Sequence, residues 1–411
     1  MSEWRKVRFG ELGEVNRGRS RNRPRYAEHL YGGPYPFIQT GDIKASNGRI
    51  TSHQQTYSEA GLAQSRLWPA GTLCITIAAD IAETGILSYP ACFPDSVVGF
   101  VADQSKCEVL FIEYMFRHLR RHIQHEATGS VQDNINLETL NRLEIPLPPL
   151  PEQRAIAAVL GALDDKIELN RRMNETLEAL AQSLFKSWFV PACRSLGAGR
   201  DATQSALSKG WRAGTLGEVE ENPRRGIQPD EIKTDTAYIG LEHMPRRSIA
   251  LSDWGHTEKL ESGKFEFERG EILFGKLRPY FHKVGVAPLD GVCSTDILVV
   301  TPKEPAWFGF VLAHVSSVEL VNHTNAASTG TKMPRANWND ISRYEVALPP
   351  KQLAADFTEK IHPLVERIIA NIHESRTLAA LRDALLPKLL PKLLSGELRV
   401  PAAAGSMEAR A

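Results

Sequence analysis

The sequence predicts an α+β protein in which two similar domains with β-rich cores are joined by two long antiparallel coiled-coil helices in a pseudo-two-fold arrangement. Three observations lead to this prediction. Related segments recur about half a chain apart, short apolar runs are broken by Gly, Pro and Asn, and two long stretches step their apolar residues by four and three. A period of half the chain indicates two domain-sized copies rather than a solenoid.

The bulk composition is that of an ordinary globular protein. The chain has 411 residues, of which 24% are charged, and its formal net charge is zero. A neutral chain is not expected to coat DNA, because non-specific affinity comes from Lys and Arg on phosphates. We see no membrane span and no secretory signal, so we expect a cytoplasmic protein. The scattered cysteines fit free thiols rather than a disulfide or zinc framework: Cys74, Cys92, Cys107, Cys193 and Cys293.

The internal repeat sets the domain boundaries. The opening Trp4–Val15 recurs at Trp211–Val219, and Leu147-Pro148-Pro149 recurs 201 residues later as Leu348-Pro349-Pro350. We therefore expect related domains at 1–146 and 209–347. Apolar runs at 75–77, 97–101, 272–274 and 297–300 predict strands, and 110–122 predicts a helix.

A long helix is expected after each domain, as spacers over 147–196 and 348–400. Pro151 can start the first one, with Glu152 in its first turn. Residues 197–208 would be a linker and 401–411 a disordered tail. The predicted coiled-coil seam consists of Ile156, Leu160, Leu163, Ile167, Asn170, Leu177 and Leu184 in the first helix, and Phe357, Ile361, Leu364, Ile368, Asn371, Leu378 and Leu385 in the second.

Asn170 and Asn371 occupy the centres of the two seams. If the helices pair antiparallel, these two asparagines would face each other, and a buried amide pair would define the register. The alternative is that both amides point to solvent. A helix over 151–190 would be about 60 Å long. Because duplex DNA repeats every ~34–36 Å, a rod of this kind can select two groove segments. Different loops in the two copies would favour an asymmetric, bipartite site.

The segment 16–26 is the first candidate for DNA contact, because it carries five arginines and no acidic residue. Its counterpart at 222–226 is also basic. The alternative is a solvated basic loop. The arginines are Arg17, Arg19, Arg21, Arg23 and Arg25 in the first copy, and Arg224 and Arg225 in the second.

Two further segments hold residues that suit nucleic acids. The basic, aromatic stretch 274–283 contains Lys276, Arg278 and Tyr280, and the alternative for it is a strand–turn–strand with a packed aromatic face. The repeated stretches 128–134 and 329–337 are rich in side chains that can read base edges, although a Gly-containing turn explains them equally well. Their candidates are Thr128, Ser130, Gln132, Asn134, Lys332, Arg335 and Asn337.

Motifs for catalysis are missing from the sequence. It contains no Walker A loop, no Gly-x-Gly-x-x-Gly cofactor loop and no Asn/Asp-Pro-Pro-aromatic tetrad of adenine methyltransferases. Pro229–Lys233 carries nuclease residue types but packs them too closely. We therefore expect no catalytic residues and no metal site.

The layout resembles the specificity subunit of type I restriction–modification systems over about 1–400. The most specific elements are the hinge Ile145–Ile156, the run Leu163-Asp164-Asp165-Lys166-Ile167, the helix end Leu184–Phe189, and Leu385–Leu390 followed by Ser395–Leu398. The resemblance implies two target-recognition domains that each read half of a bipartite DNA site. It also implies two docked methyltransferase subunits and further motor and nuclease subunits. S-adenosylmethionine, ATP and magnesium would belong to these partners.

The sequence departs from this family pattern near its end. Pro-Lys-Leu-Leu occurs twice in tandem, at Pro387–Leu390 and Pro391–Leu394, and prolines interrupt helices. The second hinge lacks the Pro-Glu-Gln of the first. Two other functions stay open on the sequence alone: a DNA-modifying enzyme with its own active site, and a coiled-coil scaffold without DNA readout.

Overall fold

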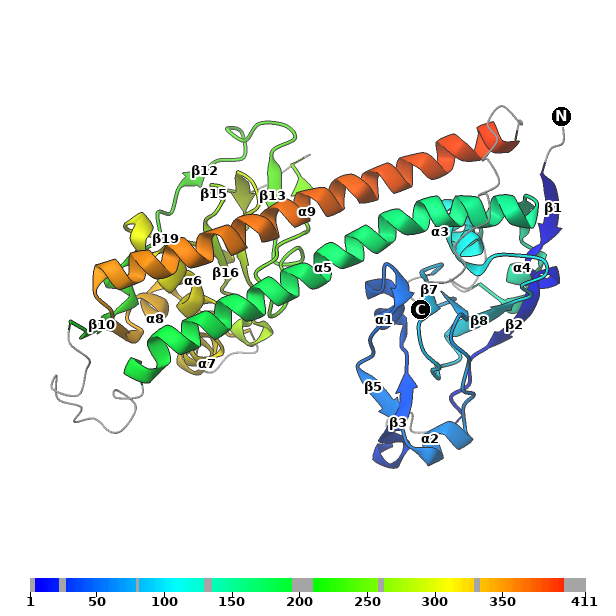
Figure 1. The fold of residues 1–411 in the computed structure, drawn as a ribbon, viewed down its shortest axis with the longest axis horizontal. Helices are drawn as coiled ribbons and strands as arrows, with labels where there is room; N and C mark the ends of the chain where they lie inside the picture. The colour runs from blue at the N-terminus through cyan, green and yellow to red at the C-terminus, as the bar shows by residue number, and fades with distance from the viewer. Residues whose placement is uncertain are drawn as a thin grey trace, which may run out of the picture. The chain divides into compact units, whose positions relative to one another are not determined.

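The computed structural model describes residues 4–21, 27–78, 81–128, 135–193, 210–257, 262–328 and 333–394. The chain forms two compact units: residues 1–164 with 380–411 make unit 1, and residues 165–379 make unit 2. Each unit therefore combines one β-rich domain with parts of both long helices, α5 (Leu150–Cys193) and α9 (Lys351–Leu394) (Figure 1).

Unit 1 is built on a five-stranded sheet of order β2-β8-β6-β7-β4, in which β4 is parallel to β7 and the other neighbours are antiparallel. Smaller sheets pair β1 with β9 and β3 with β5. The elements are β1 Arg5–Arg8, η1 Phe9–Glu11, β2 Gly13–Arg17, η2 Glu28–Leu30, β3 Tyr31–Phe37, α1 Thr40–Ala45, β4 Gly48–Ile50, β5 Gln55–Tyr57, α2 Glu59–Ala63, β6 Leu73–Thr76, β7 Thr84–Leu87, β8 Val97–Ala102, α3 Val109–Thr128, α4 Leu137–Arg142 and β9 Glu144–Leu147.

Unit 2 repeats this plan with a sheet of order β11-β19-β16-β17, and a second sheet of order β12-β15-β18-β13-β14. The elements are β10 Arg212–Thr215, η4 Leu216–Glu218, β11 Glu220–Glu221, β12 Gly226–Ile227, β13 Ala237–Ile239, β14 Gly255–His256, β15 Lys264–Phe267, β16 Ile272–Gly275, η5 Pro279–Phe281, β17 Val284–Val286, β18 Gly291–Cys293, β19 Ile297–Pro302, η6 Pro305–Trp307, α6 Phe308–Val315, α7 Val318–Ala327, α8 Trp338–Ser342 and β20 Glu345–Leu348.

The two halves are folded alike. Ala250 bridges Val286 in parallel, as β4 pairs β7 in unit 1. β10 pairs β20 as β1 pairs β9, and β11 pairs β19 as β2 pairs β8. The predicted strands lie at the centres of the sheets, where every residue of β6 and β16 is buried. The predicted helix 110–122 lies within α3, while two shorter helices, α6 and α7, follow β19.

The two long helices run past each other in opposite directions inside unit 2 (Figure 1). All the predicted seam residues are buried or half-buried. The seam serves two purposes, however. Ile156 and Leu160 join the core of unit 1, and Phe357 and Ile361 join the core of unit 2, so the first turns of each helix dock on the preceding domain. The tandem prolines do not end the second helix, because α9 extends to Leu394.

The predicted pairing of Asn170 with Asn371 is wrong by about one helical turn. Asn371 instead donates to the Oδ1 of Asn174 at 2.8 Å. Asn170 donates to Glu374 at 2.8 Å and to Ser375 at 3.3 Å. The two-fold relation survives this correction, because Asn174 and Ser375 are themselves 201 residues apart. The pseudo-axis therefore passes between two polar layers instead of through a single pair.

Replacing Asn371 with leucine is expected to lower the free energy of unfolding by about 1–3 kcal/mol, because Asn174 loses its partner in a buried site. The double replacement with Asn174→Leu should recover most of this loss, since two apolar side chains leave no orphaned amide. A double-mutant cycle from chemical denaturation measures the coupling. Strictly additive effects would contradict a direct amide pair.

Candidate nucleic-acid interface

The first arginine segment leaves the sheet at the end of β2. Arg17, Arg19 and Arg21 are exposed, and no hydrogen-bond or ion-pair partner of their guanidinium groups is found among the described residues. The backbone beneath them is anchored, because Gly18 N–H donates to Val97 at 2.8 Å and Arg19 N–H donates to Phe93 at 3.1 Å. This arrangement presents three cations from a well-defined backbone, which suits a phosphate or guanine ligand.

A glycine is required at position 18. A Cβ there would lie 2.3 Å from the carbonyl oxygen of Pro94 and 2.4 Å from that of Phe93. Beside the segment, Arg66 donates to Glu14 and lies 3.9 Å over the ring of Trp68. The hydrogen bond from Arg66 is the main cause of the lowered pKa of Glu14. Sequence reasoning missed this ion pair, which braces the edge of the sheet.

Several predicted contacts lie outside the described residues. They are Arg23, Arg25, Ser130, Gln132, Asn134, Lys332 and the side chain of Thr128.

The basic counterpart in unit 2 is less open. Arg224 is exposed and has a φ of 47°, but Arg225 donates to the carboxylate of Glu271 and lies 3.9 Å from Glu268. The predicted pair of cations is therefore reduced to one open guanidinium, since an arginine held by a half-buried carboxylate is less available to a phosphate.

The structure brings together the two other candidate segments of unit 2. Ala336 N–H donates to the carbonyl of Lys276 at 2.9 Å, and Arg278 N–H donates to that of Pro334 at 2.8 Å. An isolated antiparallel bridge joins Leu277 to Arg335. Residues 276–278 and 334–336 thus form one surface, although they are about 60 positions apart in the sequence.

This joint surface is part aromatic and part cationic. Tyr280 is 47% exposed, and Phe281 packs at 4.7 Å from it. The guanidinium of Arg246 lies 4.2 Å over the Phe281 ring, a contact that sequence reasoning missed. η5 carries both rings between left-handed residues, which bend the chain outward. The strand–turn–strand of the alternative is present, because β16 pairs with β17 across η5 and Phe274 is buried, while Tyr280 stays open.

Two predicted readers in this surface have structural partners. Arg335 lies 3.5 Å from the carboxylate of Asp296. Asn337 caps α8 by accepting from Asp340 N–H at 3.1 Å, as Asn136 caps α4 in unit 1. A capping carboxamide oxygen is occupied, so Asn337 serves the fold first. The preference of asparagine for the N-cap position of a helix is the sequence signal that would have identified this capping role.

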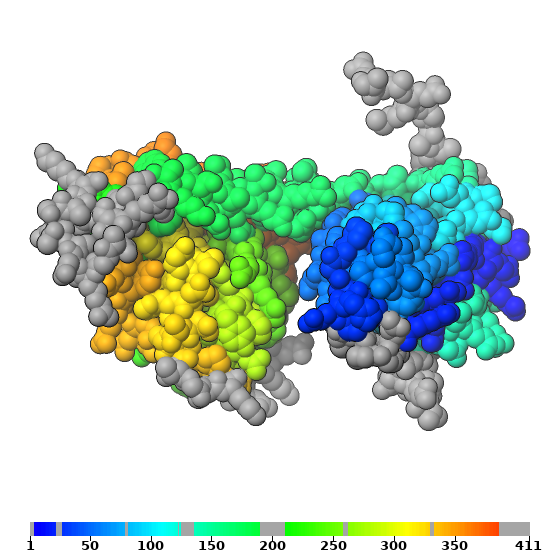
Figure 2. Space-filling model, turned by 90° about the horizontal axis from the view of Figure 1, so that it is seen from below, coloured from blue at the N-terminus to red at the C-terminus, as the bar shows by residue number. Residues whose placement is uncertain are grey.

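A cavity of about 1070 Å³ lies inside unit 2 between α5 and the domain. Its wall is made in part by residues of α5, α6 and α7, and the green surface of α5 adjoins the yellow surface of this part of unit 2 in Figure 2. His314 lines the cavity and is buried, which lowers its pKa to about 3, and its Nε2 has no partner among the described groups. The uncharged ring of His314 packs against Phe185, which also lines the cavity.

The described residues show neither a metal cluster nor a membrane-spanning helix. They contain no group of three or more His, Cys, Asp or Glu side chains placed to hold a metal ion. Within the same ranges, no helix combines the length and apolarity that crossing a bilayer requires.

The chain is similar to proteins of one kind. The family model described as the type I restriction modification DNA specificity domain matches residues 1–179. The type I restriction enzyme MjaIX specificity subunit of Methanocaldococcus jannaschii is 27% identical over 97% of this chain and 94% of its own length. The EcoDI specificity subunit of Escherichia coli is 22% identical over 96% and 89%.

The fold is also shared with a solved structure. The S subunit of a type I restriction–modification system from M. genitalium matches with a TM-score of 0.55 at 16% identity, covering 94% of this chain and 96% of that one. That likeness concerns the doubled fold. Together with the family model over residues 1–179 and the two relatives, it makes the chain similar along nearly its whole length to the specificity subunits of type I restriction–modification systems.

Proposed function

We propose that this chain recognises the DNA sequence for a type I restriction–modification complex, and that it reads an asymmetric site in two halves. The observation that carries the proposal is the doubled fold with unlike surface loops. From the end of β2 onward the chain presents Arg17, Arg19 and Arg21, whereas the equivalent stretch after β11 presents Arg224 alone. Two domains with the same fold but different exposed side chains are expected to recognise two different half-sites.

We further propose that the chain is not itself catalytic and acts on DNA in the cytoplasm through partners. S-adenosylmethionine, ATP and magnesium would be bound by methyltransferase and motor subunits. The helices offer apolar surface for such docking, since Leu169 and Leu180 of α5 are 52% and 46% exposed and lie three turns apart on one side. An enzyme with its own active site and a scaffold without DNA readout are both less well supported, because the relatives are specificity subunits.

The domains proposed to read DNA are 1–146 and 209–347, with spacers over 147–196 and 348–400. In unit 1, the arginine segment is the proposed contact. In unit 2, it is the surface made by Lys276, Arg278, Tyr280 and Arg335. Backbone anchoring favours both, because a reading surface must hold its side chains in a repeatable position.

Replacing Arg17, Arg19 and Arg21 with alanine is expected to weaken DNA binding by the complete complex. Loss of three phosphate contacts would reduce the slope of log affinity against log salt by about 2–3. The measurement is a salt titration of binding to the target that methylation mapping identifies. Arg171 is a matched control, because its ion pairs with Glu168 and Glu175 stay within α5. An unchanged salt slope would remove the segment from the interface.

A further inference from the structure

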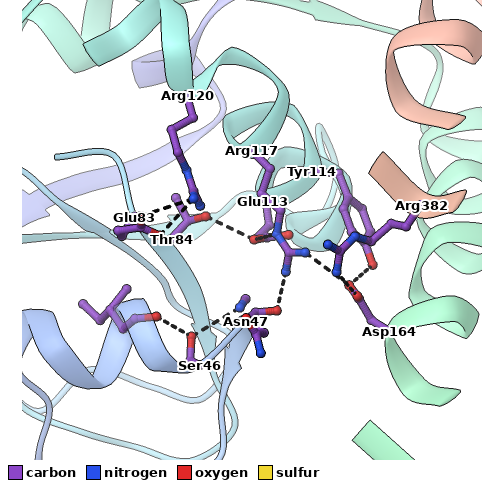
Figure 3. Close-up of polar contacts among 12 residues, drawn as sticks. Ser46, Asn47, Glu83, Thr84, Glu113, Tyr114, Arg117, Arg120, Asp164 and Arg382 are labelled. Atoms are coloured by element: carbon purple, nitrogen blue, oxygen red, sulfur yellow. Dashed lines mark hydrogen bonds and ion pairs between the residues drawn. The ribbon is translucent and has the colours of Figure 1, made fainter. Parts of the chain in front are cut away.

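Asp164 lies at the centre of a buried polar network in unit 1 (Figure 3). Its side chain is 8% exposed. It accepts a hydrogen bond from the hydroxyl of Tyr114 at 2.7 Å and one from Arg382 at 2.6 Å, and Arg117 lies 3.6 Å away. The three partners come from two elements, α3 of the recognition domain and the last turns of α9. One carboxylate on α5 therefore ties the domain to both long helices.

A second layer extends the network into the sheet. The Arg117 Nε donates to Glu113 at 2.5 Å, and its Nη2 donates to the carbonyl of Asn47 at 2.5 Å, ahead of β4. Glu113 is fully buried, which raises its pKa, and it also accepts from Thr84 of β7 at 3.1 Å. Movement of α3 against either the sheet or the helices would break at least one of these contacts.

A buried network of this kind contributes more to a defined orientation of the domain than to the free energy of unfolding. The guanidinium groups of Arg117 and Arg382 face the carboxyl groups of Glu113 and Asp164 and, nearer the surface, Asp383. Burying the inner groups costs desolvation that their attraction roughly offsets. Apolar side chains would hold the same surfaces together equally well. They would do so without a preferred angle, because apolar contact is non-directional. Hydrogen bonds to one carboxylate permit a narrow range of geometries.

Unit 2 lacks this arrangement at the equivalent positions. The helices repeat at an offset of 201 residues, so Arg382 corresponds to Ala181 and Asp164 to Val365. Along α6, which follows β19 as α3 follows β8, the residue at the place of Tyr114 is His314. Ala181 and His314 line the cavity of unit 2. The first domain is thus joined to its helices through Asp164, whereas the second uses a different carboxylate: Glu178 of α5 accepts hydrogen bonds from the Ser248 hydroxyl at 2.7 Å and from Ile249 N–H at 3.0 Å.

We propose that Asp164, with Arg382 and Tyr114, is a positioning site that sets the angle of the first recognition domain on the two helices. This inference rests on the proposed function. Its consequence is that the first recognition domain binds well only when the two DNA half-sites are separated by the correct distance. One added base pair moves a half-site by about 3.4 Å along the duplex. A recognition domain that is no longer held at a fixed angle would adjust to that shift and would still bind DNA with the altered spacing.

The test measures how the complete complex discriminates between DNA spacings. Binding is compared on the mapped target and on duplexes with one base pair added to or removed from the spacer between half-sites. For Arg382→Ala, the affinity ratio between correct and altered spacing is expected to fall about tenfold. Tyr114→Phe removes one hydrogen bond but keeps the ring, and should reduce the ratio by a smaller factor. Arg382→Lys should restore part of it.

The controls separate the possible outcomes. Arg171→Ala, on the surface of α5, should leave the ratio unchanged. A lower melting temperature with an unaltered ratio in both Arg382→Ala and Tyr114→Phe would mean that the network is merely structural, and would overturn the inference. Failure of the wild-type complex to bind its target would instead contradict the proposed function. If Arg382→Ala does not fold, the affinity ratio measured for Tyr114→Phe tests the inference in its place.

Discussion

Exchanging residues 1–149 for the equivalent part of another specificity subunit is expected to change one half of the DNA target completely and leave the other half unaltered. The cut falls at Pro149, between β9 and α5, so the β1–β9 pair is transferred intact. A cut within β9 would divide that pair. Mapping methylated sites in cells that express the chimera with its methyltransferase measures the result. The reciprocal exchange of 210–349 is the matched control and should change the other half only.

The exchange also has a structural requirement. The transferred domain must supply the hydroxyl and guanidinium groups that contact Asp164, because Asp164 and its partner Arg382 stay with the recipient's helices. A donor lacking Tyr114 and Arg117 equivalents should yield a chimera with weaker binding, about 1–3 kcal/mol less stable, because Asp164 keeps Arg382 but loses its hydrogen bonds to the transferred domain. A chimera in which both half-sites changed would refute independent reading by two domains.

Replacing Glu220 with glutamine is expected to remove a pH dependence of stability from unit 2. Glu220 lies in β11, is 1% exposed, and neither carboxylate oxygen has a partner among the described groups. Burial raises its pKa to about 8, and the charge of Lys303 opposes that rise only in part. The folded chain therefore holds a proton on Glu220 at neutral pH that the unfolded chain has released.

The sign of this effect follows from proton linkage. A raised carboxyl pKa means that the native state binds more protons, so stability falls as pH rises from the ordinary value near 4.5 to about 8. At about 1.4 kcal/mol per pKa unit, the variant should be more stable than the wild type above pH ~8 by on the order of 3–5 kcal/mol. Below pH ~5 the two should be alike.

Chemical denaturation of both proteins at about pH 5 and about pH 9 tests this, with the transition of unit 2 as readout. The neighbouring Glu221→Gln serves as control, because that side chain is exposed and removing its charge should not alter the slope with pH. Equal stability of wild type and Glu220→Gln at both values would contradict a protonated buried carboxyl.

Local features of the sequence were sufficient to predict most of the architecture. The strands β6, β8, β16 and β19 coincide with apolar runs, because buried strands need nothing but apolar side chains. The helices α5 and α9 follow from apolar steps of four and three, because that spacing places side chains on one face. The half-chain repeat predicted two like domains, since similar sequences meet similar packing demands.

The same reasoning failed where several elements meet. Asn170 was paired with Asn371 on seam centres, yet the stagger between helices depends on how every side chain along them packs. Arg225 was expected to be open, but Glu271, distant in sequence, holds it. Nothing in the run Leu163-Asp164-Asp165 reveals that one aspartate faces two arginines and a tyrosine, although a charge beside an apolar seam position is a usable signal.

The amino-acid order alone therefore determined the doubling, the strands, the two long helices and the basic segments, because each of these depends on residues that are close together in the chain. Only the tertiary structure decided which arginines stay without a carboxylate partner, which asparagines form a hydrogen bond with each other, and how the first domain is joined to its helices. Those outcomes depend on distances between groups far apart in sequence, and a buried charge takes whichever partner the fold brings within hydrogen-bonding reach.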